Sequence, residues 1–274
     1  GAGFIGSHIV DELVRRGEAV RVIDDLSTGR AENLADVRDR IVFYEEDIRH
    51  LPKIRPCFAG IDYVIHEAAL ASVPQSVRDP ITTNTTNIDG TLNVLVAARD
   101  AHARRLVFAA SSSAYGDNPQ LPLTEAHLPQ PLSPYALTKL AGEYYCRIFA
   151  GIYGLETVAL RYFNVFGPRQ NADSPYSGVL SIFITAYLRG ERPTIFGDGG
   201  QSRDFVYVEN VVDATLQACT ASGITGSVIN VGVGESRTLN QTIVRLNRVL
   251  GCQVAPRYGP VSYTHLRAHE TVLD

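Results

Sequence analysis

The chain has 274 residues, of which 45% are hydrophobic and 20% charged, and its formal net charge is −4. This balance is typical of a compact protein with a sizeable core, and the lack of long Lys and Arg blocks argues against nucleic acid as a partner. No apolar run approaches the ~20 residues that a membrane-spanning helix needs, so no membrane partner is expected. The four cysteines are scattered without a C-x-x-C pair, which predicts no metal site and no disulfide framework and favours a reducing, cytoplasmic setting.

Short apolar runs alternate with helical patterns over the first 165 residues. We expect strands that end at Asp25, Asp47, Ala69, Ser113 and Val165, and helices over 7–16, 86–102 and 133–153. Strands that alternate with helices of this length indicate βαβ units and a parallel sheet covered on both faces. The pattern therefore predicts an α/β fold with a doubly wound, Rossmann-like parallel sheet.

The alternation of strand and helix patterns ends after Asn164, where prolines and the glycine-rich segment 197–200 break the chain into shorter pieces. Short pieces of this kind are typical of a smaller unit attached to the main sheet. We therefore predict a Rossmann-like domain over 1–165 and a smaller C-terminal annex over 166–260. Part of the segment 204–222 is expected to return to the first domain.

The opening GAGFIG has the spacing G-x-G-x-x-G at Gly1, Gly3 and Gly6 and leads directly into a helical pattern. Glycines at this spacing permit a tight turn and a close approach of the backbone to a pyrophosphate, which then lies on the positive end of the helix. Asp24 ends the next strand about 20 residues on, where a carboxylate binds the adenosine ribose and repels a 2′-phosphate. The pattern predicts an NAD site, which also includes Phe4, Ile5, Ala68 and, beside the adenine, Asp47 and Ile48, although an Asp at a strand end is also common in turns.

The segment LSPYALTKLAGEYY, residues 132–145, places a tyrosine and a lysine four residues apart at the start of an amphipathic helix. Tyr135 and Lys139 then lie one above the other on one helix face. An ammonium beside a phenol favours the phenolate and lowers a pKa that starts near ~10. The pair can therefore act as a base at neutral pH, although an ordinary surface helix with an unrelated Tyr and Lys has the same pattern.

Seven motifs follow one another along the chain: GAGFIGSH, VIDDLSTG, VIHEAALASVPQS, AASSSAYGD, SPYALTK, LRYFNVFGPRQ and GDGGQSRDFVYVEN. With these motifs the chain resembles the extended short-chain dehydrogenase/reductase family, and within it the nucleotide-sugar epimerases, from Gly1 to about Tyr258. The segment SVPQSVRDPITTN and the serine triplet before Ala114 are most similar to 4-epimerases that act on UDP-N-acetylhexosamines in bacterial polysaccharide synthesis.

The resemblance implies a role for individual residues at these motifs. Tyr135 would transfer the proton, and Lys139 would hydrogen-bond the nicotinamide ribose and keep the phenolate available. Ser112, and next to it Ser111, would share the sugar 4-hydroxyl, although serines at a strand end also cap loops. The remaining substrate-binding positions are Ser72, Ser113, Asn164 and Gly178, together with Arg203, which would hold the diphosphate or, alternatively, pair with Asp204 or Glu209.

The implied reaction is the NAD-dependent 4-epimerisation of UDP-N-acetylglucosamine and UDP-N-acetylgalactosamine through a 4-keto sugar, in a homodimer joined by the helices around 92–98 and 137–149. UDP-glucose and UDP-glucuronate stay open as alternative substrates. From a different class, a non-catalytic NAD-sensing module is a further alternative. A 4,6-dehydratase of the same family uses an acidic pair directly after its strand-end hydroxyl residue to eliminate water. Ser113 and Ala114 occupy these positions here and carry no acidic group, so elimination of water is not expected.

Both ends of the chain depart from the family pattern. That pattern begins with a strand and a glycine that would precede Gly1. We therefore expect the sheet to be interrupted between the strands that end at Asp25 and Ala69, or these two strands to pair directly. At the other end, the segment 261–274 does not resemble the family and is expected to be non-native sequence.

Overall fold

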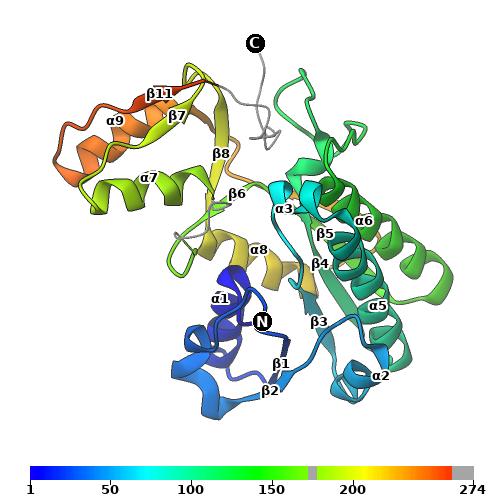
Figure 1. The fold of residues 1–274 in the computed structure, drawn as a ribbon. Coiled ribbons are helices and arrows are strands. Elements are labelled where there is room, and N and C mark those ends of the chain that lie inside the picture. The colour runs from blue at the N-terminus through cyan, green and yellow to red at the C-terminus, as the bar shows by residue number, and fades with distance from the viewer. Residues whose placement is uncertain (172–177, 261–274) are drawn as a thin grey trace.

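The computed structural model describes residues 1–171 and 178–260. Its centre is a four-stranded parallel sheet in the order β3-β4-β5-β9 (Figure 1), formed by Tyr63–His66, Arg105–Ser111, Glu156–Tyr162 and Ser227–Val231. β4 is buried along its whole length and β5 along all but its first residue, as a parallel sheet covered on both faces requires. The α/β fold with a parallel Rossmann-like sheet, predicted from the sequence, is confirmed.

Helices cover both faces of this sheet (Figure 1): Gly90–Asp100 (α5) and Pro134–Tyr153 (α6) on one face, Phe4–Arg15 (α1) and Val208–Thr220 (α8) on the other. Successive residues of β4 point into opposite cores, because side chains alternate along a strand. Phe108 packs in the core that contains Leu95 of α5, and Val107 packs in the core that contains Val211 of α8. No helix in the described parts of the chain is long and apolar enough to cross a membrane.

The parallel sheet is interrupted beside β3. Val20–Asp24 (β1) pairs only with Ile41–Glu45 (β2), and no strand within residues 1–171 and 178–260 joins β1 to β3. Helices connect the β1-β2 pair to the four-stranded sheet, since α1 packs on α8 through Ile9 and Val212. The interruption expected between these strands is therefore present, and the two strands do not pair directly.

Shorter helical segments connect the strands. They comprise 3₁₀ segments at Ala31–Arg40, Arg55–Phe58 and Ser112–Tyr115, the short helices Leu51–Ile54 (α2), Val73–Arg78 (α3) and Pro80–Asn84 (α4), and a π-helical turn at Thr85–Asp89. The helix expected over 86–102 is thus a π-helical turn that continues into α5. The strand expected to reach Val165 breaks at Phe163 into β5 and Asn164–Phe166 (β6).

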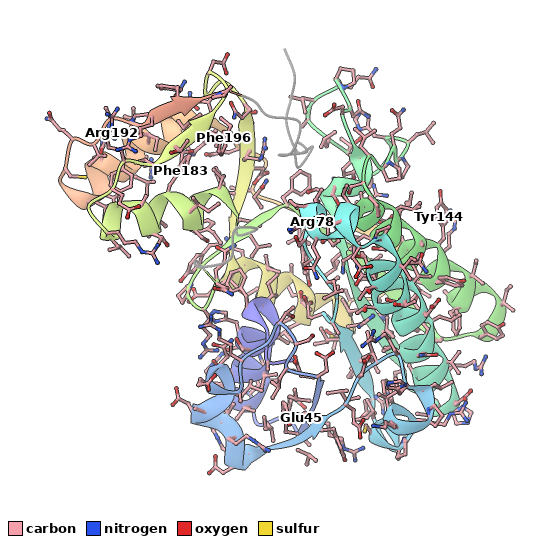
Figure 2. The ribbon with its side chains drawn as sticks, viewed as in Figure 1. Glu45, Arg78, Tyr144, Phe183, Arg192 and Phe196 are labelled. Atoms are coloured by element: carbon pink, nitrogen blue, oxygen red, sulfur yellow. The ribbon has the colours of Figure 1, made fainter. Side chains whose placement is uncertain are left out.

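The described part of the annex contains two small sheets, flanked by helices. The strands Ser236–Thr238 (β10), Ser202–Tyr207 (β8) and β6 form one sheet, and Thr194–Phe196 (β7) pairs with Arg257–Gly259 (β11) in the other. Val179–Leu188 (α7) and Leu239–Leu250 (α9) flank the second sheet (Figure 1). Phe183 of α7 packs with Ile195 of β7 and Ile243 of α9 in the annex core (Figure 2).

α6 lies unusually close to β4, because a glycine faces the strand. A Cβ atom added to Gly142 would lie 2.3 Å from Cζ of Phe108, which is closer than real Cβ contacts come. Gly151 lies on the same helix, and a Cβ added there would meet no described residue within 4 Å. One glycine of the helix is therefore required by packing and the other is not.

We expect Gly142→Ala to lower the melting temperature and Gly151→Ala to leave it unchanged or raise it. Alanine gains about 1 kcal/mol over glycine in a helix interior. At residue 142 this gain is outweighed by overpacking, which typically costs ~1–3 kcal/mol. Thermal unfolding of both variants tests the difference, and equal stabilisation by the two substitutions would show that α6 does not need the close approach.

Candidate active site

The residues predicted to handle the sugar lie at the carboxyl ends of the central strands, where doubly wound folds bind their ligands. β4 ends at Ser111, directly opposite Tyr162 at the end of β5. The chain then continues through one residue into β6, which begins with Asn164. Asn164 therefore lies only two residues, about 7 Å of extended chain, beyond the position that faces Ser111.

The serine triplet forms a tight turn at the end of β4. Oγ of Ser111 accepts hydrogen bonds from the backbone N–H of Ser113 at 3.2 Å and from the Ser113 hydroxyl at 2.8 Å. Ser111 and Ser112 are buried, and Ser113 is half-buried. The capping role that the sequence left open thus applies to Ser111, which shapes the turn that carries Ser112.

The first turn of α6 is fixed by two serines. Ser133 caps the helix, since its Oγ accepts a hydrogen bond from the backbone N–H of Ala136 at 3.1 Å. The fully buried Ser76 of α3 accepts a hydrogen bond from the backbone N–H of Tyr135 at 3.1 Å. Tyr135 itself is half-buried. Sequence reasoning missed Ser76, which lies in the SVPQS motif and ties that motif to the tyrosine.

Lys139 follows one turn later and is buried against β4. Its Nζ donates a hydrogen bond to the carbonyl oxygen of Ala109 at 2.7 Å and lies 5.1 Å from the centre of the Phe108 ring. Burial lowers the pKa of Lys139 to about 8, and the carboxylate of Glu67 opposes this effect. In its ammonium form, Lys139 favours a phenolate on the same face of α6.

A buried ion pair joins α6 to β5 beneath this turn. Nε and Nη2 of Arg161 donate to the two carboxylate oxygens of Glu143 at 2.8 and 2.7 Å, and both side chains are 4% exposed. The Arg161 guanidinium also lies 4.4 Å from the centre of the Tyr115 ring, and the Tyr115 hydroxyl donates to Asn230 Oδ1 at 2.6 Å. These contacts hold the end of the serine turn between α6, β5 and β9.

The glycine-rich opening forms a bare backbone cradle before α1. Within residues 1–171 and 178–260, a Cβ added to Gly3 would meet nothing closer than 4 Å. One added to Gly6 would lie 3.0 Å from the Gly1 carbonyl oxygen, and one added to Gly1 would lie 2.2 Å from Cγ1 of Val22. Gly3 precedes the helix and offers no side-chain cap to its first N–H groups, which belong to the turn that includes Phe4 and Ile5. Open space at a positive helix end suits a pyrophosphate.

Asp24 lies at the end of β1, beside this cradle. Its carboxylate accepts hydrogen bonds from the backbone N–H groups of Ala2 at 2.8 Å and Leu26 at 2.9 Å. Hydrogen bonds from these backbone N–H groups favour the ionised form of the carboxylate. The ionised carboxylate keeps the charge that a ribose site requires.

Asp24, Ile48 and Ala68 line one small cavity of about 50 Å³, as a common adenosine site predicts. The residues of this lining that the sequence did not indicate are Ile23, Asp25, Ser27, Thr28, Glu46, Ala69, Leu70 and Thr86. Asp47 is not among them. Its carboxylate instead accepts hydrogen bonds from the backbone N–H and the Nε of Arg49, both at 2.8 Å, so Asp47 shapes the turn after β2. The open cradle and the carboxylate of Asp24 are the groups with which a Rossmann-like fold binds NAD.

The small sheet β10-β8-β6 carries two of the predicted substrate-binding residues. Nδ2 of Asn164 donates to the backbone oxygen of Asp204 at 3.0 Å, and Arg203 lies next to Asp204 on β8. The Asp204 carboxylate accepts hydrogen bonds from the backbone N–H groups of Val233 and Gly234. The topology thus brings Asn164 and Arg203 to adjacent strands of one sheet.

The two remaining predicted positions mark helix starts. Ser72 caps α3, because its Oγ accepts a hydrogen bond from the backbone N–H of Gln75 at 3.2 Å. Gly178 precedes α7, and a Cβ there would lie 3.2 Å from Nε2 of Gln170. Both residues therefore have local structural roles in addition to the roles implied by the motifs.

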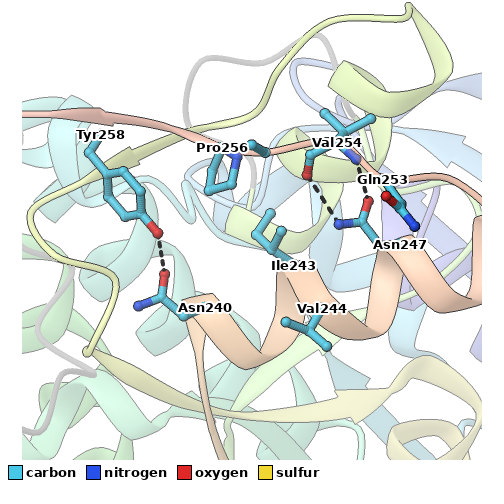
Figure 3. Close-up of a pocket in the computed structure, with 9 residues that line it drawn as sticks. Asn240, Ile243, Val244, Asn247, Gln253, Val254, Pro256 and Tyr258 are labelled. Carbon is cyan, nitrogen blue, oxygen red and sulfur yellow. Dashed lines mark hydrogen bonds between the residues drawn. The ribbon is translucent and has the colours of Figure 1, made fainter.

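A larger cavity of about 360 Å³ lies in the annex between α9 and the segment 253–258 (Figure 3). Its polar groups pair with each other: the Tyr258 hydroxyl donates to Asn240 Oδ1, and Asn247 makes two hydrogen bonds to the backbone of Val254 (Figure 3). It contains none of the residues predicted for cofactor, proton transfer or substrate. Size alone therefore does not identify the site in this protein.

Comparison with known proteins shows the family. Residues 1–232 match the NAD dependent epimerase/dehydratase family, and the chain belongs to it. A UDP-glucose 4-epimerase of Mycolicibacterium smegmatis is 38% identical over 275 residues, covering 97% of this chain and 86% of that protein.

Two solved structures are similar over almost the whole chain. The UDP-N-acetylglucosamine 4-epimerase of Methanobrevibacter ruminantium, solved with UDP-N-acetylmuramic acid, is 42% identical with a TM-score of 0.91, covering 95% of this chain and 83% of that one. The UDP-glucose 4-epimerase of Thermotoga maritima, solved with UDP-glucose, is 40% identical with a TM-score of 0.92, covering 100% of this chain and 87% of that one. The similarity therefore includes both the Rossmann-like sheet and the annex.

Proposed function

We propose that this member of the NAD dependent epimerase/dehydratase family is a UDP-sugar 4-epimerase whose sugars are UDP-N-acetylglucosamine and UDP-N-acetylgalactosamine. The observation that carries the proposal is the Tyr135 and Lys139 pair on α6, held beside the serine turn of β4 by Ser76 and by the close packing of the helix. The 4-epimerase activity named for the similar proteins supports the same reaction.

The chemistry follows from this arrangement. When bound, NAD supplies a reversible hydride acceptor. Tyr135, as the phenolate, removes the proton of the sugar 4-hydroxyl while the C4–H bond breaks, so that the sugar becomes a 4-keto sugar. After the sugar has turned about its phosphate linkage, Tyr135 returns the proton to the oxygen of the newly formed alcohol. Ser112 shares the hydrogen bond of the 4-hydroxyl, and the Lys139 ammonium favours the phenolate.

The turning of the sugar requires that the nucleotide stay fixed. Arg203 is suited to this role because a guanidinium binds phosphate oxygens with two parallel hydrogen bonds. Asn164 and Arg203 lie on neighbouring strands of the small sheet, and Asn164 follows β5 directly. The diphosphate anchor on the small sheet and the serine turn at the end of the central sheet are therefore connected by one continuous segment of chain.

A non-catalytic NAD-sensing module is the alternative from another class. Such a module needs the cradle and Asp24 but has no use for a tyrosine and a buried lysine beside a serine turn. Conversion of one UDP-sugar into its 4-epimer separates the two functions, because only an enzyme moves hydride from the substrate to the cofactor and back.

We expect Tyr135→Phe to abolish turnover while UDP-sugar binding is kept, because the change removes one hydroxyl and no packing volume. The rate should fall by at least about 10²-fold, the usual contribution of a positioned acid or base. Steady-state epimerisation and calorimetric binding of UDP measure the two effects separately. Retention of more than a small fraction of the rate would refute Tyr135 as the base.

An apolar stripe on α6 supports a homodimer. Leu137, Tyr144, Ile148 and Ile152 are 54%, 53%, 45% and 71% exposed and recur at helical spacing on one face. Tyr144 projects away from the body of the protein (Figure 2). Contiguous apolar surface of this kind marks protein interfaces. We propose that the same face of a second copy covers it, so that α5 and α6 of both copies form a four-helix bundle.

A charge in this stripe should separate the two copies. We expect Ile148→Lys to halve the mass measured by light scattering, because the ammonium would be buried at the interface. Val249→Lys is the matched control, since Val249 is 73% exposed on α9 and outside the stripe. A wild-type protein that is monomeric at micromolar concentration would contradict the dimer.

Small residues around the sugar support the N-acetylated substrates. The motifs put Ala71, Ser113 and Gly178 near the place where the sugar turns, together with Ala114. The structure corrects the last of these, because Ala114 is fully buried and does not reach a pocket surface. The 2-acetamido group adds volume that large side chains would exclude by steric clash. Bulk can be added at Gly178, since among the described residues a Cβ there meets only the end of the Gln170 side chain.

We expect kcat/KM to be higher for the UDP-N-acetylhexosamine pair than for UDP-glucose, and Gly178→Tyr to reverse or flatten this preference. The tyrosine should leave epimerisation of the unacetylated sugar intact, because it excludes only the larger group. Measuring kcat/KM for both sugar pairs in wild type and variant tests the argument, with UDP-glucuronate as a third substrate. A wild type that prefers UDP-glucose or UDP-glucuronate, or a variant with unchanged selectivity, would show that the pocket argument is wrong.

A further inference from the structure

The small sheet of the annex places a second arginine beside Arg203. In the antiparallel pair of β8 and β10, Arg237 lies directly opposite Arg203. In the parallel pair of β6 and β8, Asn164 lies opposite Phe205, two residues beyond Arg203. Paired residues, and residues two apart on one strand, point to the same face of a sheet. One face of this sheet therefore carries Arg237, Arg203 and Asn164.

Two arginines at one cross-strand position bring two positive charges together. Directly opposite residues have Cβ atoms about 5 Å apart. Asp204 points to the other face of the sheet and accepts hydrogen bonds from Val233 and Gly234. Two guanidinium groups at this spacing can bind the two charged groups of one anion, because each forms charge-assisted hydrogen bonds with anionic oxygens.

Arg237 has a partner that a ligand can displace. Its Nη2 donates to Oε2 of Glu235 at 2.6 Å, and the two side chains are 44% and 64% exposed. Ion pairs this exposed contribute little to stability. Arg237 can therefore exchange the carboxylate for a phosphate oxygen at low cost. Glu235 then acts as a competitor of the ligand for the same guanidinium.

We propose that Arg237 binds the diphosphate of the nucleotide sugar together with Arg203, so that the two guanidinium groups hold the two phosphoryl groups across β8 and β10. This inference rests on the proposed UDP-sugar substrate. Arg237 contributes to binding and not to proton transfer, because its strand lies in the annex and it acts on the end of the substrate that stays fixed. Its removal therefore affects KM and leaves kcat unchanged.

Two substitutions with opposite expected effects test the assignment. Arg237→Ala should raise KM for the UDP-sugar and the Kd for UDP about tenfold, the usual loss for one charged hydrogen-bond partner, with kcat within twofold of wild type. Glu235→Gln should lower both constants, because it removes the competing carboxylate and keeps the side-chain shape. Both changes should shrink as salt is raised. Arg248→Ala, an exposed arginine at the far end of α9, is the matched control and should change neither constant.

Binding of UDP and of uridine by calorimetry separates the possible outcomes. If Arg237 binds the diphosphate, Arg237→Ala weakens UDP and leaves uridine unchanged, while the melting temperature of the free protein does not fall. Wild-type turnover and UDP binding with unchanged constants in Arg237→Ala would overturn this inference and leave the proposed function intact. A wild type that binds no UDP and converts no UDP-sugar would refute the proposed function and this assignment with it.

Discussion

The close approach of α6 to the central sheet is the constraint on which the rest of the site depends. Gly142 lets the helix backbone lie against the Phe108 ring. The short separation of α6 and β4 then allows Lys139 to reach the Ala109 carbonyl oxygen. It also brings Glu143 into bidentate contact with Arg161 of β5. A larger residue at 142 would move all three contacts together, because they lie on one face of a rigid helix.

The contacts beneath α6 have opposite effects on the stability of the fold. Burial of an ammonium lowers its pKa and destabilises the charged form, as the shift of Lys139 to about 8 shows. The Arg161 and Glu143 pair is also desolvated, but two parallel hydrogen bonds join Nε and Nη2 of the arginine to both carboxylate oxygens, and loss of either partner would leave a buried charge. The helix thus combines a functional group that is costly for folding with an ion pair that fixes its position.

The annex and the main sheet are coupled through one short stretch of backbone. β5 ends at Tyr162 and β6 begins at Asn164, so the strand that faces Ser111 leads directly into the sheet that carries Arg203. No flexible linker separates them. A nucleotide anchored on the small sheet would therefore stay at a defined distance from the serine turn while its sugar moves, which is what a reaction that presents both faces of one carbon requires.

The sequence by itself determined the features that depend on local spacing. Alternating apolar strands and helices predict the parallel sheet, glycines at G-x-G-x-x-G predict the cradle, and an i, i+4 spacing places Tyr135 and Lys139 on one helix face. Tertiary structure decided everything that depends on register or on contacts between distant segments. Ser76 reaches Tyr135 across 59 residues, and Arg237 meets Arg203 only through the pairing of β8 and β10. Asp47 accepts hydrogen bonds from Arg49, and Ser111 caps the turn at the end of β4. A short polar side chain at a strand end bonds the nearest backbone or side-chain donor unless a ligand competes for it. Local patterns cannot reveal such choices, because they depend on which groups the fold brings within hydrogen-bond distance.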